Sequence, residues 1–330
     1  MTKISAIITC YNVQEYIATA MQSIIDTGLE DLELIVVDDS SSDRTRTVIE
    51  AVAANLPANI AFVPLYFSKN TIGGVASAGN AGLDVATGDV IIFIDGDDWV
   101  IPHNLKKAVD QHLAGKTDFT VCGCLEYWND NGGYSQYPEA QYWDGLPSQT
   151  TLAERRDTLL RMAPFPWRKI YRRDFLERHG IRFPVGDFFF EDNPFHWETT
   201  VKAQAFDFFE PPTHVHRMAR SGQTVSPKGT KYIKIFDHAQ IIRDKLKQDG
   251  ALEANQHIYT DWLLKHIIWC SAHVPSGFLN EVFERAKPHV TNLGPDVFWH
   301  SAAVSNFNAS DMRKLAAIYL DERFEFFREF

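Results

Sequence analysis

The chain has 330 residues, 45% of them hydrophobic and 23% charged, which is enough apolar material for one large domain or two smaller ones. Its formal net charge of −11 argues against nucleic acid as a partner, because a protein that binds a phosphate backbone needs a basic face. An acidic chain that binds anionic phosphates must hold them locally, with a metal ion or a few well-placed Lys and Arg side chains.

Strand and helix patterns alternate through the first third of the chain. Apolar runs predict buried strands, and apolar residues at helical spacing predict the helices between them. The predicted strands are Ile4–Thr9, Leu32–Val37, Ile60–Leu65 and Val90–Ile94. The predicted helices contain Tyr16, Ala20 and Ile24, then Val48 and Val52, then Gly73–Ala86, and the last opens at Pro102. This alternation predicts an α/β fold with a mostly parallel central sheet flanked by helices.

Three polar clusters directly follow predicted strands. They are Thr9–Asn12, Asp38-Asp39 and Asp95–Asp98. In open parallel sheets, ligands bind outside the carboxyl ends of the strands. The three clusters therefore form the first candidate site.

The cluster Asp95-Gly96-Asp97-Asp98 places three carboxylates within four residues. Their repulsion is costly unless a cation or another partner offsets it. Mg²⁺ or Mn²⁺ uses one or two protein carboxylates and completes its shell with diphosphate oxygens and water. The alternative is a solvated acidic turn that caps the next helix, and the position at a buried strand's end favours the metal site.

Asp39 also follows a strand, where its carboxylate is placed to accept from a pyrimidine base or a ribose hydroxyl. The alternative is a helix cap, but Ser42 or Asp43 can fill that role. Thr9 and Tyr11 are candidates for the same pocket, although a Tyr beside a strand end is commonly just a packing residue.

Glu191-Asp192 follows the apolar run of residues 188–190. A carboxylate that emerges from a hydrophobic segment tends to have a raised pKa, which suits a general base. The alternative is a helix start, where acids favour the dipole. Spacing alone does not choose between the two.

His214 and His216 would point the same way on a strand, and Arg217 and Arg220 follow them. A His can ligate a metal and an Arg can bind diphosphate. For any single one of these residues, we favour the alternative of a polar residue on the surface of a strand or loop over metal or diphosphate binding.

The rest of the chain carries fewer signals. The region from about Thr117 to Ser226 is mixed and rich in Trp, most of which we expect in the core. Beyond it, two helical apolar stripes consist of Tyr232, Ile235, Phe236, Ala239 and Ile242, and of Tyr259, Leu263, Ile267 and Cys270.

The cysteines and the N-terminus predict a reduced, cytoplasmic protein, with the inner face of the membrane as an open location. Cys10, Cys122, Cys124 and Cys270 have neither zinc-ligand nor redox spacing. The N-terminal apolar run is too short for a signal peptide, and no stretch spans a bilayer. The chain also lacks G-x-G-x-x-G and P-loop motifs, which disfavours a dehydrogenase or a P-loop enzyme.

Four segments together resemble family 2 glycosyltransferases, the inverting enzymes of the GT-A fold, of the type that builds bacterial cell-surface polysaccharides. They occur in the family's order and spacing over roughly Lys3–Ser226. They are ISAIITCYNVQEYIATAMQSI, LELIVVDDSSSD, KNTIGGVASAGNAGLDVATGDVIIFIDGDDW with its DxD motif, and PWRKIYRRDFLERHGIRFP followed by FFFEDNPF. The chain departs from the family in lacking the glycine that often follows the two acids at Asp38-Asp39.

The resemblance implies roles on the donor side. Thr9, Tyr11 and Asp39 would contact the nucleoside, usually uridine in this family, and Asp95 would approach the ribose or diphosphate. Asp97 would be the main ligand of a divalent metal, Mn²⁺ or Mg²⁺.

Asp98 would share the metal with Asp97, and the choice of first ligand between them stays open. His216, or else His214, would complete metal or diphosphate binding. On the acceptor side, Asp192 would be the catalytic base with Glu191 beside it.

The implied function is metal-dependent, inverting transfer of a hexosyl or N-acetylhexosaminyl group. The expected donor is a UDP-sugar, and the expected acceptor is a hydroxyl of a glycan or lipid-linked glycan. The Gln-x-x-Arg-Trp motif of the family's processive members is missing, as are their membrane spans, so transfer is expected to be non-processive.

The implied domains are residues 1–226, with a nucleotide-sugar half at 1–100 and an acceptor half at 101–226, and a helical region at 227–330. A nucleotidyltransferase and a catalytically silent nucleotide-sugar-binding protein remain the alternatives. Homodimer formation and peripheral membrane contact stay open.

Overall fold

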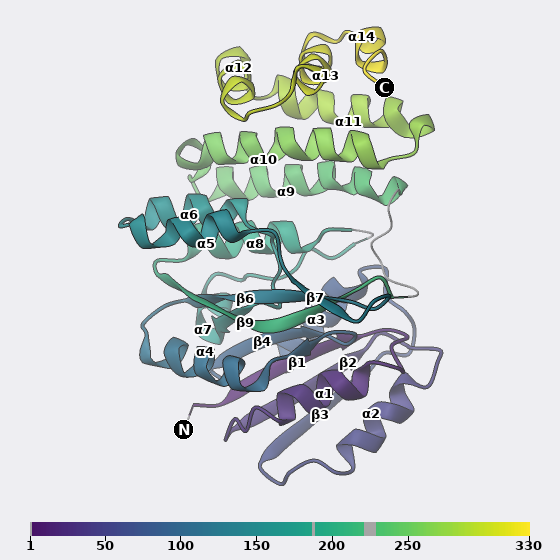
Figure 1. The fold of residues 1–330 in the computed structure, drawn as a ribbon, viewed down its shortest axis with the longest axis vertical. Helices are drawn as coiled ribbons and strands as arrows, with labels where there is room; N and C mark the ends of the chain where they lie inside the picture. The colour runs from purple at the N-terminus through teal and green to yellow at the C-terminus, as the bar shows by residue number, and fades with distance from the viewer. Residues whose placement is uncertain (1, 187–188, 221–228) are drawn as a thin grey trace. The chain divides into compact units, whose positions relative to one another are not determined.

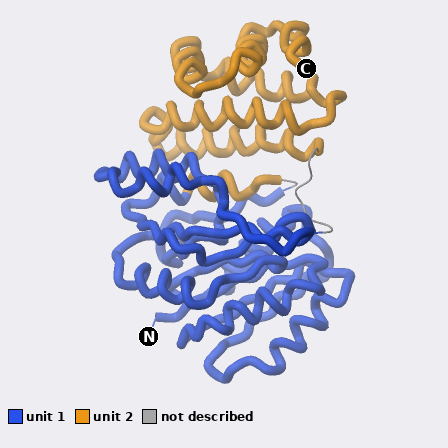
Figure 2. Tube along the Cα trace, viewed as in Figure 1, with its two compact units in different colours: residues 1–187, 199–223 blue, residues 188–198, 224–330 orange. Residues whose placement is uncertain are grey.

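The structure is a computed structural model that describes residues 2–186, 189–220 and 229–330. The chain divides into two compact units (Figure 2), residues 1–187 with 199–223 and residues 188–198 with 224–330. The expected domain boundary at residues 226 and 227 lies outside the described residues. No helix in the described ranges has both the length and the apolar content to cross a membrane.

The described residues of the first unit form a nine-stranded sheet in the order β3-β2-β1-β4-β8-β6-β9-β5, with β7 paired to β6 (Figure 1). The strands are β1 Ile4–Cys10, β2 Leu32–Asp38, β3 Ile60–Tyr66, β4 Val90–Asp95, β5 Trp99–Val100, β6 Phe119–Trp128, β7 Gly133–Gln136, β8 Lys169–Arg172 and β9 Phe206–Met218. The first four strands pair in parallel, as do β6 and β9, whereas β5, β7 and β8 run antiparallel to their neighbours. The predicted α/β class with a mostly parallel sheet is confirmed.

Helices pack on both faces of the parallel strands. Apolar residues of α1 and α4 share one buried cluster with side chains of β1, β2 and β4, and α2 adds Ile49. On the other face, α3 packs so closely on β1 that a Cβ on Gly82 would lie 2.4 Å from Ile7 Cγ2. The helices of this unit are α1 Ile17–Ile25, α2 Thr45–Ala53, α3 Gly74–Val85, α4 Pro102–Ala114, α5 Ala140–Gly145, α6 Leu152–Arg161 and α7 Arg173–Arg178, with a short 3-10 helix at Leu146–Ser148.

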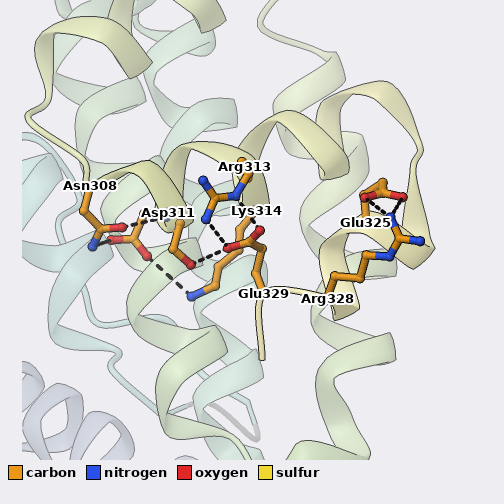
Figure 3. Close-up of polar contacts among 8 residues, drawn as sticks. Asn308, Asp311, Arg313, Lys314, Glu325, Arg328 and Glu329 are labelled. Atoms are coloured by element: carbon orange, nitrogen blue, oxygen red, sulfur yellow. Dashed lines mark hydrogen bonds and ion pairs between the residues drawn. The ribbon is translucent and has the colours of Figure 1, made fainter.

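The second unit is helical. Its helices are α9 Ile235–Gln248, α10 Leu252–His273, α11 Leu279–Thr291, α12 Pro295–Val304, α13 Ala309–Leu320 and α14 Arg323–Phe327, with 3-10 helices at Thr230–Lys234 and Ser276–Phe278. The beginning of α8, which spans Asp192–Lys202, also belongs to it. Both predicted apolar stripes are buried. At the chain end, Glu329 accepts hydrogen bonds from Ser310 and Arg313 of α13 (Figure 3).

Candidate active site

The three polar clusters meet at the carboxyl edge of the parallel strands, as the sequence predicted. Thr9 pairs in register with Asp95, and Cys10 pairs with Asp38. The backbone continues the pairing beyond the strands, because the N–H of Gly96 donates to the Thr9 carbonyl at 2.8 Å. Side chains from β1, β2 and β4 therefore share one edge of the sheet.

Gly96 allows the turn after β4 to lie directly on β1. A Cβ at this position would lie 2.7 Å from Cys10 Cβ and 3.0 Å from the Thr9 carbonyl oxygen. Any larger residue would push the turn away from the sheet. The glycine between the acids thus fixes where their carboxylates stand.

Asp39 does not cap a helix. Its carboxylate accepts from Thr71 N at 2.9 Å, Thr71 Oγ1 at 3.1 Å and Asn70 Nδ2 at 3.0 Å. Asp43 serves the start of α2 instead, where it accepts from Thr45 N at 2.9 Å. Burial raises the pKa of Asp39, and the Thr71 bonds offset part of that rise. Asn70 and Thr71 were missed in the sequence because nothing local marks them as partners of a residue 31 or 32 positions away.

Thr9 and Tyr11 differ in exposure. The Thr9 side chain is buried, and its hydroxyl donates to Asp95 Oδ1 at 3.5 Å. Tyr11 is 47% exposed, so its ring is not simply a packing residue. The next residue, Asn12, has a φ of +51° and accepts from Ser42 N at 2.8 Å, which joins the loops after β1 and β2.

Asp98 is buried and hydrogen-bonded, which excludes a solvated acidic turn at this residue. It accepts from Arg217 N at 2.7 Å, and His216 Nδ1 lies 2.8 Å from its other carboxylate oxygen. The helix that follows, α4, has no side-chain cap at Ile101. Burial lowers the pKa of His216, but the charge and hydrogen bond of Asp98, with Asp95 and Asp97 nearby, raise it to about 9.

Asp97 carries a different partner. Arg220 Nε pairs with Asp97 Oδ2. Arg217 Nε donates to the Asp97 carbonyl oxygen at 2.8 Å, and the Arg217 guanidinium lies 4.6 Å from the Tyr16 ring centroid and 4.8 Å from that of Trp99. From sequence alone, an ordinary surface role is the more heavily weighted interpretation for each arginine, but Arg217 contacts the backbone of Asp97 and Arg220 its side chain.

The residues at the carboxyl edge of the parallel strands fit a divalent metal ion whose coordination shell is completed by diphosphate oxygens and water. Among the described residues, no group of three or more His, Cys, Asp and Glu stands ready to hold a metal ion. However, the bond from Nδ1 to Asp98 leaves Nε2 of His216 as the ring nitrogen for a ligand, the arrangement in which a carboxylate orients a metal-binding His. One imidazole with the Asp97 carboxylate suits an ion that takes its remaining ligands from diphosphate and water.

His214 is a core residue. Its ring is fully buried, contacts Thr213 Oγ1 at 2.9 Å, and burial lowers its pKa to about 3. Trp167 packs against both histidines, 5.8 Å from the His214 ring centroid and 5.6 Å from that of His216. Of the two candidates, His216 is therefore the one beside the acidic turn.

Glu191 and Asp192 belong to the second unit, at the start of α8. The helix-start interpretation holds for Asp192, the first residue of α8, whose Oδ1 accepts from Asn193 Nδ2 at 3.0 Å. Burial and the neighbouring Asp192 raise the pKa of Glu191 to about 7, as expected for a carboxylate after an apolar run. The catalytic role of the pair stays a prediction.

Left-handed backbone conformations occur beside the predicted site residues. Asn12, Ser40, Phe190 and Ala219 have φ between +51° and +70°, although none is glycine. Each is the direct neighbour of Tyr11, Asp39, Glu191 or Arg220, whereas Asn306 and Asp321 have the same conformation in the helical unit. Such strain persists only where surrounding contacts hold it, and it collects at functional sites.

A groove of about 670 Å³ between α1 and α2 contains none of the predicted site residues.

Comparisons with known proteins bear on the family and the fold of the chain. The family model described as Glycosyl transferase family 2 matches residues 5–180, more than half of the chain. The uncharacterized glycosyltransferase EpsJ of Bacillus subtilis (strain 168) is 28% identical over 226 residues, 68% of this chain and 63% of EpsJ. The poly(ribitol-phosphate) beta-N-acetylglucosaminyltransferase TarS of Staphylococcus aureus (strain MW2) is 25% identical over 248 residues, 74% of this chain and 40% of TarS. The chain spans less than two thirds of the length of these curated relatives.

Solved structures show the same fold. The crystal structure of TarS 1-349 in complex with UDP has a TM-score of 0.74 at 19% identity, covering 98% of this chain and 89% of that one. The mannosyltransferase PcManGT from Pyrobaculum calidifontis, in complex with GDP-Man and Mn²⁺, has a TM-score of 0.50 at 19% identity, covering 99% and 84%. The likeness to TarS confirms the expected GT-A-like α/β fold with a helical C-terminal region.

Proposed function

The chain belongs to glycosyl transferase family 2, and on this premise we propose that it transfers a sugar from a nucleoside diphosphate to an acceptor hydroxyl, with a divalent metal. The observation that carries the proposal is the shared carboxyl edge, where Asp39 follows β2 and Asp95 and Asp97 lie at the end of β4, on the two sides of β1. The same family membership makes a nucleotidyltransferase the weaker alternative.

On the donor side, Asp39 accepts from the base or ribose, with Thr9 and Tyr11 beside it. Its bonds to Asn70 and Thr71 hold the carboxylate in place before a ligand arrives, which reduces the entropy lost on binding. Asp95 approaches the ribose or diphosphate. The structure of TarS with UDP supports uridine as the base.

Asp97 and His216 hold the metal in this proposal, and Asp98 orients His216 rather than acting as a first ligand. The metal supplies positive charge that neutralises the departing diphosphate. Mn²⁺ in the PcManGT structure supports a divalent ion, with Mn²⁺ or Mg²⁺ as the candidates.

Asp192 takes the proton from the acceptor hydroxyl as that oxygen attacks the anomeric carbon, and Glu191 supports it. One displacement without a covalent intermediate inverts the configuration. The transferred group is a hexosyl or N-acetylhexosaminyl group, and the name of TarS, a beta-N-acetylglucosaminyltransferase, supports the second. The proposed acceptor is a hydroxyl of a glycan or a lipid-linked glycan.

A thermal-shift panel tests the proposal directly. The full chain is heated with nucleoside diphosphates and nucleotide-sugars, each with Mn²⁺ and with EDTA. We expect uridine ligands to raise the unfolding midpoint only with the metal, because ligands that bind the native state stabilise it. No shift with any nucleotide would reject the proposal. Equal shifts in EDTA would favour a metal-independent binding protein.

A further inference from the structure

Arg220 and Asp97 form an ion pair at the place where the proposed function puts a metal. Arg220 follows the end of β9, and Asp97 follows the end of β4. Arg220 Nε contacts Asp97 Oδ2, and their side chains are only 11% and 15% exposed. An ion pair screened this well from water is stronger than one on the surface.

The backbone that delivers Arg220 is strained. Ala219 has a φ of +59°, a region that residues with a Cβ rarely adopt. Ala219 separates Met218, the last residue of β9, from Arg220. Such a conformation persists where surrounding contacts hold it, and the Arg220–Asp97 pair is one such contact.

The neighbouring Arg217 is held differently. Its Nε donates to the Asp97 backbone carbonyl, and its NH1 donates to Asn129 Oδ1 at 3.0 Å. The rings of Tyr16 and Trp99 flank its guanidinium. Arg217 thus contacts the turn through a carbonyl oxygen, whereas Arg220 puts its charge on the carboxylate that the metal would need.

We propose that Arg220 is a placeholder cation. It neutralises Asp97 until metal and diphosphate bind, and its guanidinium then pairs with the diphosphate instead of with Asp97. The inference rests on the proposed function. Without nucleotide, Arg220 competes with the metal for Asp97 and repels its charge. With nucleotide, the same guanidinium finds phosphate oxygens, for which its planar fork is well suited.

The proposal predicts that metal and nucleotide bind cooperatively and that Arg220 sets the coupling. Coupling between two ligands is reciprocal. If Arg220 weakens metal binding in the absence of nucleotide and pairs with the nucleotide when it is bound, each ligand must raise the affinity for the other. Removing the guanidinium should therefore tighten metal binding in the absence of nucleotide and loosen nucleotide binding in its presence. A residue that only ligates substrate would change the second quantity alone.

The test measures the affinity of the full chain for Mn²⁺, with and without UDP. Electron paramagnetic resonance gives the concentration of free Mn²⁺ at each step of the titration. For Arg220→Gln we expect Mn²⁺ alone to bind about fivefold tighter or more, and UDP with Mn²⁺ to bind weaker by a similar factor. Arg220→Lys keeps the charge and should stay near the wild type for Mn²⁺ alone. Asp97→Asn added to Arg220→Gln should remove the gain.

Arg178→Gln is the matched control. Arg178 is 57% exposed on α7, which begins just after Arg172, the residue in register with the first residue of β4. The substitution therefore removes one charge at the opposite edge of the sheet. It should change neither the affinity for Mn²⁺ alone nor the affinity for UDP with Mn²⁺. If Arg220→Gln leaves the affinity for Mn²⁺ alone unchanged or weaker, while the wild type binds Mn²⁺ with UDP, the placeholder role is wrong. If the wild type binds no Mn²⁺ even with UDP, the proposed metal site itself fails.

Discussion

The three acids after β4 take three different roles. Asp95 is in register with Thr9 and bonds its hydroxyl, Asp97 pairs with Arg220, and Asp98 is buried against His216. In the sequence the three carboxylates look equivalent. In the structure they differ in their hydrogen-bond and ion-pair partners. This difference favours Asp97 over Asp98 as the first metal ligand in the proposed mechanism.

Asp98 and His216 should behave as one unit in stability measurements made in EDTA. A hydrogen bond between charged groups contributes about 1.5–3 kcal/mol. We expect a double-mutant cycle of Asp98→Asn and His216→Gln, followed by urea unfolding, to show coupling of about that size. His112 is buried and bonds Thr120 rather than Asp98, so Asp98→Asn with His112→Gln is the control. Additive effects in the first cycle would contradict the pairing.

At the scale of elements, the amino ends of the strands are fastened by Glu33 at the start of β2. Its buried carboxylate accepts from Lys3 Nζ at 2.8 Å, Ser5 Oγ at 2.6 Å, and Thr87 N and Oγ1 at 2.9 and 2.7 Å. One side chain thus joins β2 to β1 and to the segment before β4. The edge of the sheet opposite the candidate site is therefore fixed by one carboxylate.

Glu33→Gln should destabilise the protein by about 2–4 kcal/mol at pH 7, because it removes a buried, hydrogen-bonded charge. Burial alone would raise the pKa of Glu33, but bonds from Lys3, Ser5 and Thr87 lower it from 4.5 to about 2. A depressed carboxylate pKa stabilises the fold above pH 4.5, and this contribution is lost as pH falls toward 2.

Urea unfolding of the wild type and Glu33→Gln across this range checks the sign. The difference between them should be constant above pH 4.5 and shrink below it. Glu50→Gln, on the surface of α2, should stay within about 0.5 kcal/mol of the wild type. A difference that grows as the pH falls would contradict the account.

Strand positions were predictable from sequence, whereas the partners at the site were not. Buried parallel strands are continuous apolar runs, so β1, β2 and β4 lie within one residue of their predicted bounds. The outer strand β3 also does, although its residues are only half-buried or exposed. The bonds of Asp98 join residues 118 and 119 positions apart, because β9 lies beside β5 and β6. That register depends on tertiary pairing, for which no local periodicity exists.

At the scale of the whole molecule, residues 188–198 belong with the helical unit although they precede β9 in the chain. Trp197 is buried, with its ring 6.0 Å from both Tyr259 and Trp262, and Lys245 pairs with Glu198. The helical unit therefore holds the segment that carries Glu191 and Asp192. Its removal should affect the proposed base as well as stability.

A chain ending at residue 226 should be less stable than the full chain, because it leaves the Trp197 side of α8 without these partners. We expect a lower midpoint in thermal unfolding and increased binding of a dye specific for exposed apolar surface. Phe324→Ser in the full chain is the control, since Phe324 is 84% exposed. An unchanged midpoint with no added dye binding would show that the helical unit does not support α8.

The central claim is metal-dependent glycosyl transfer with Asp192 as base, and release of UDP from UDP-sugars tests it most directly. Each donor is incubated with the full chain and a panel of glycan and lipid-linked acceptors. With Mn²⁺, acceptor-dependent UDP release is expected for the wild type. EDTA should abolish it, and Asp192→Asn should lower it about 10²–10⁴-fold while UDP binding persists. Release that is equally fast in EDTA, or that survives Asp192→Asn unchanged, would contradict the account.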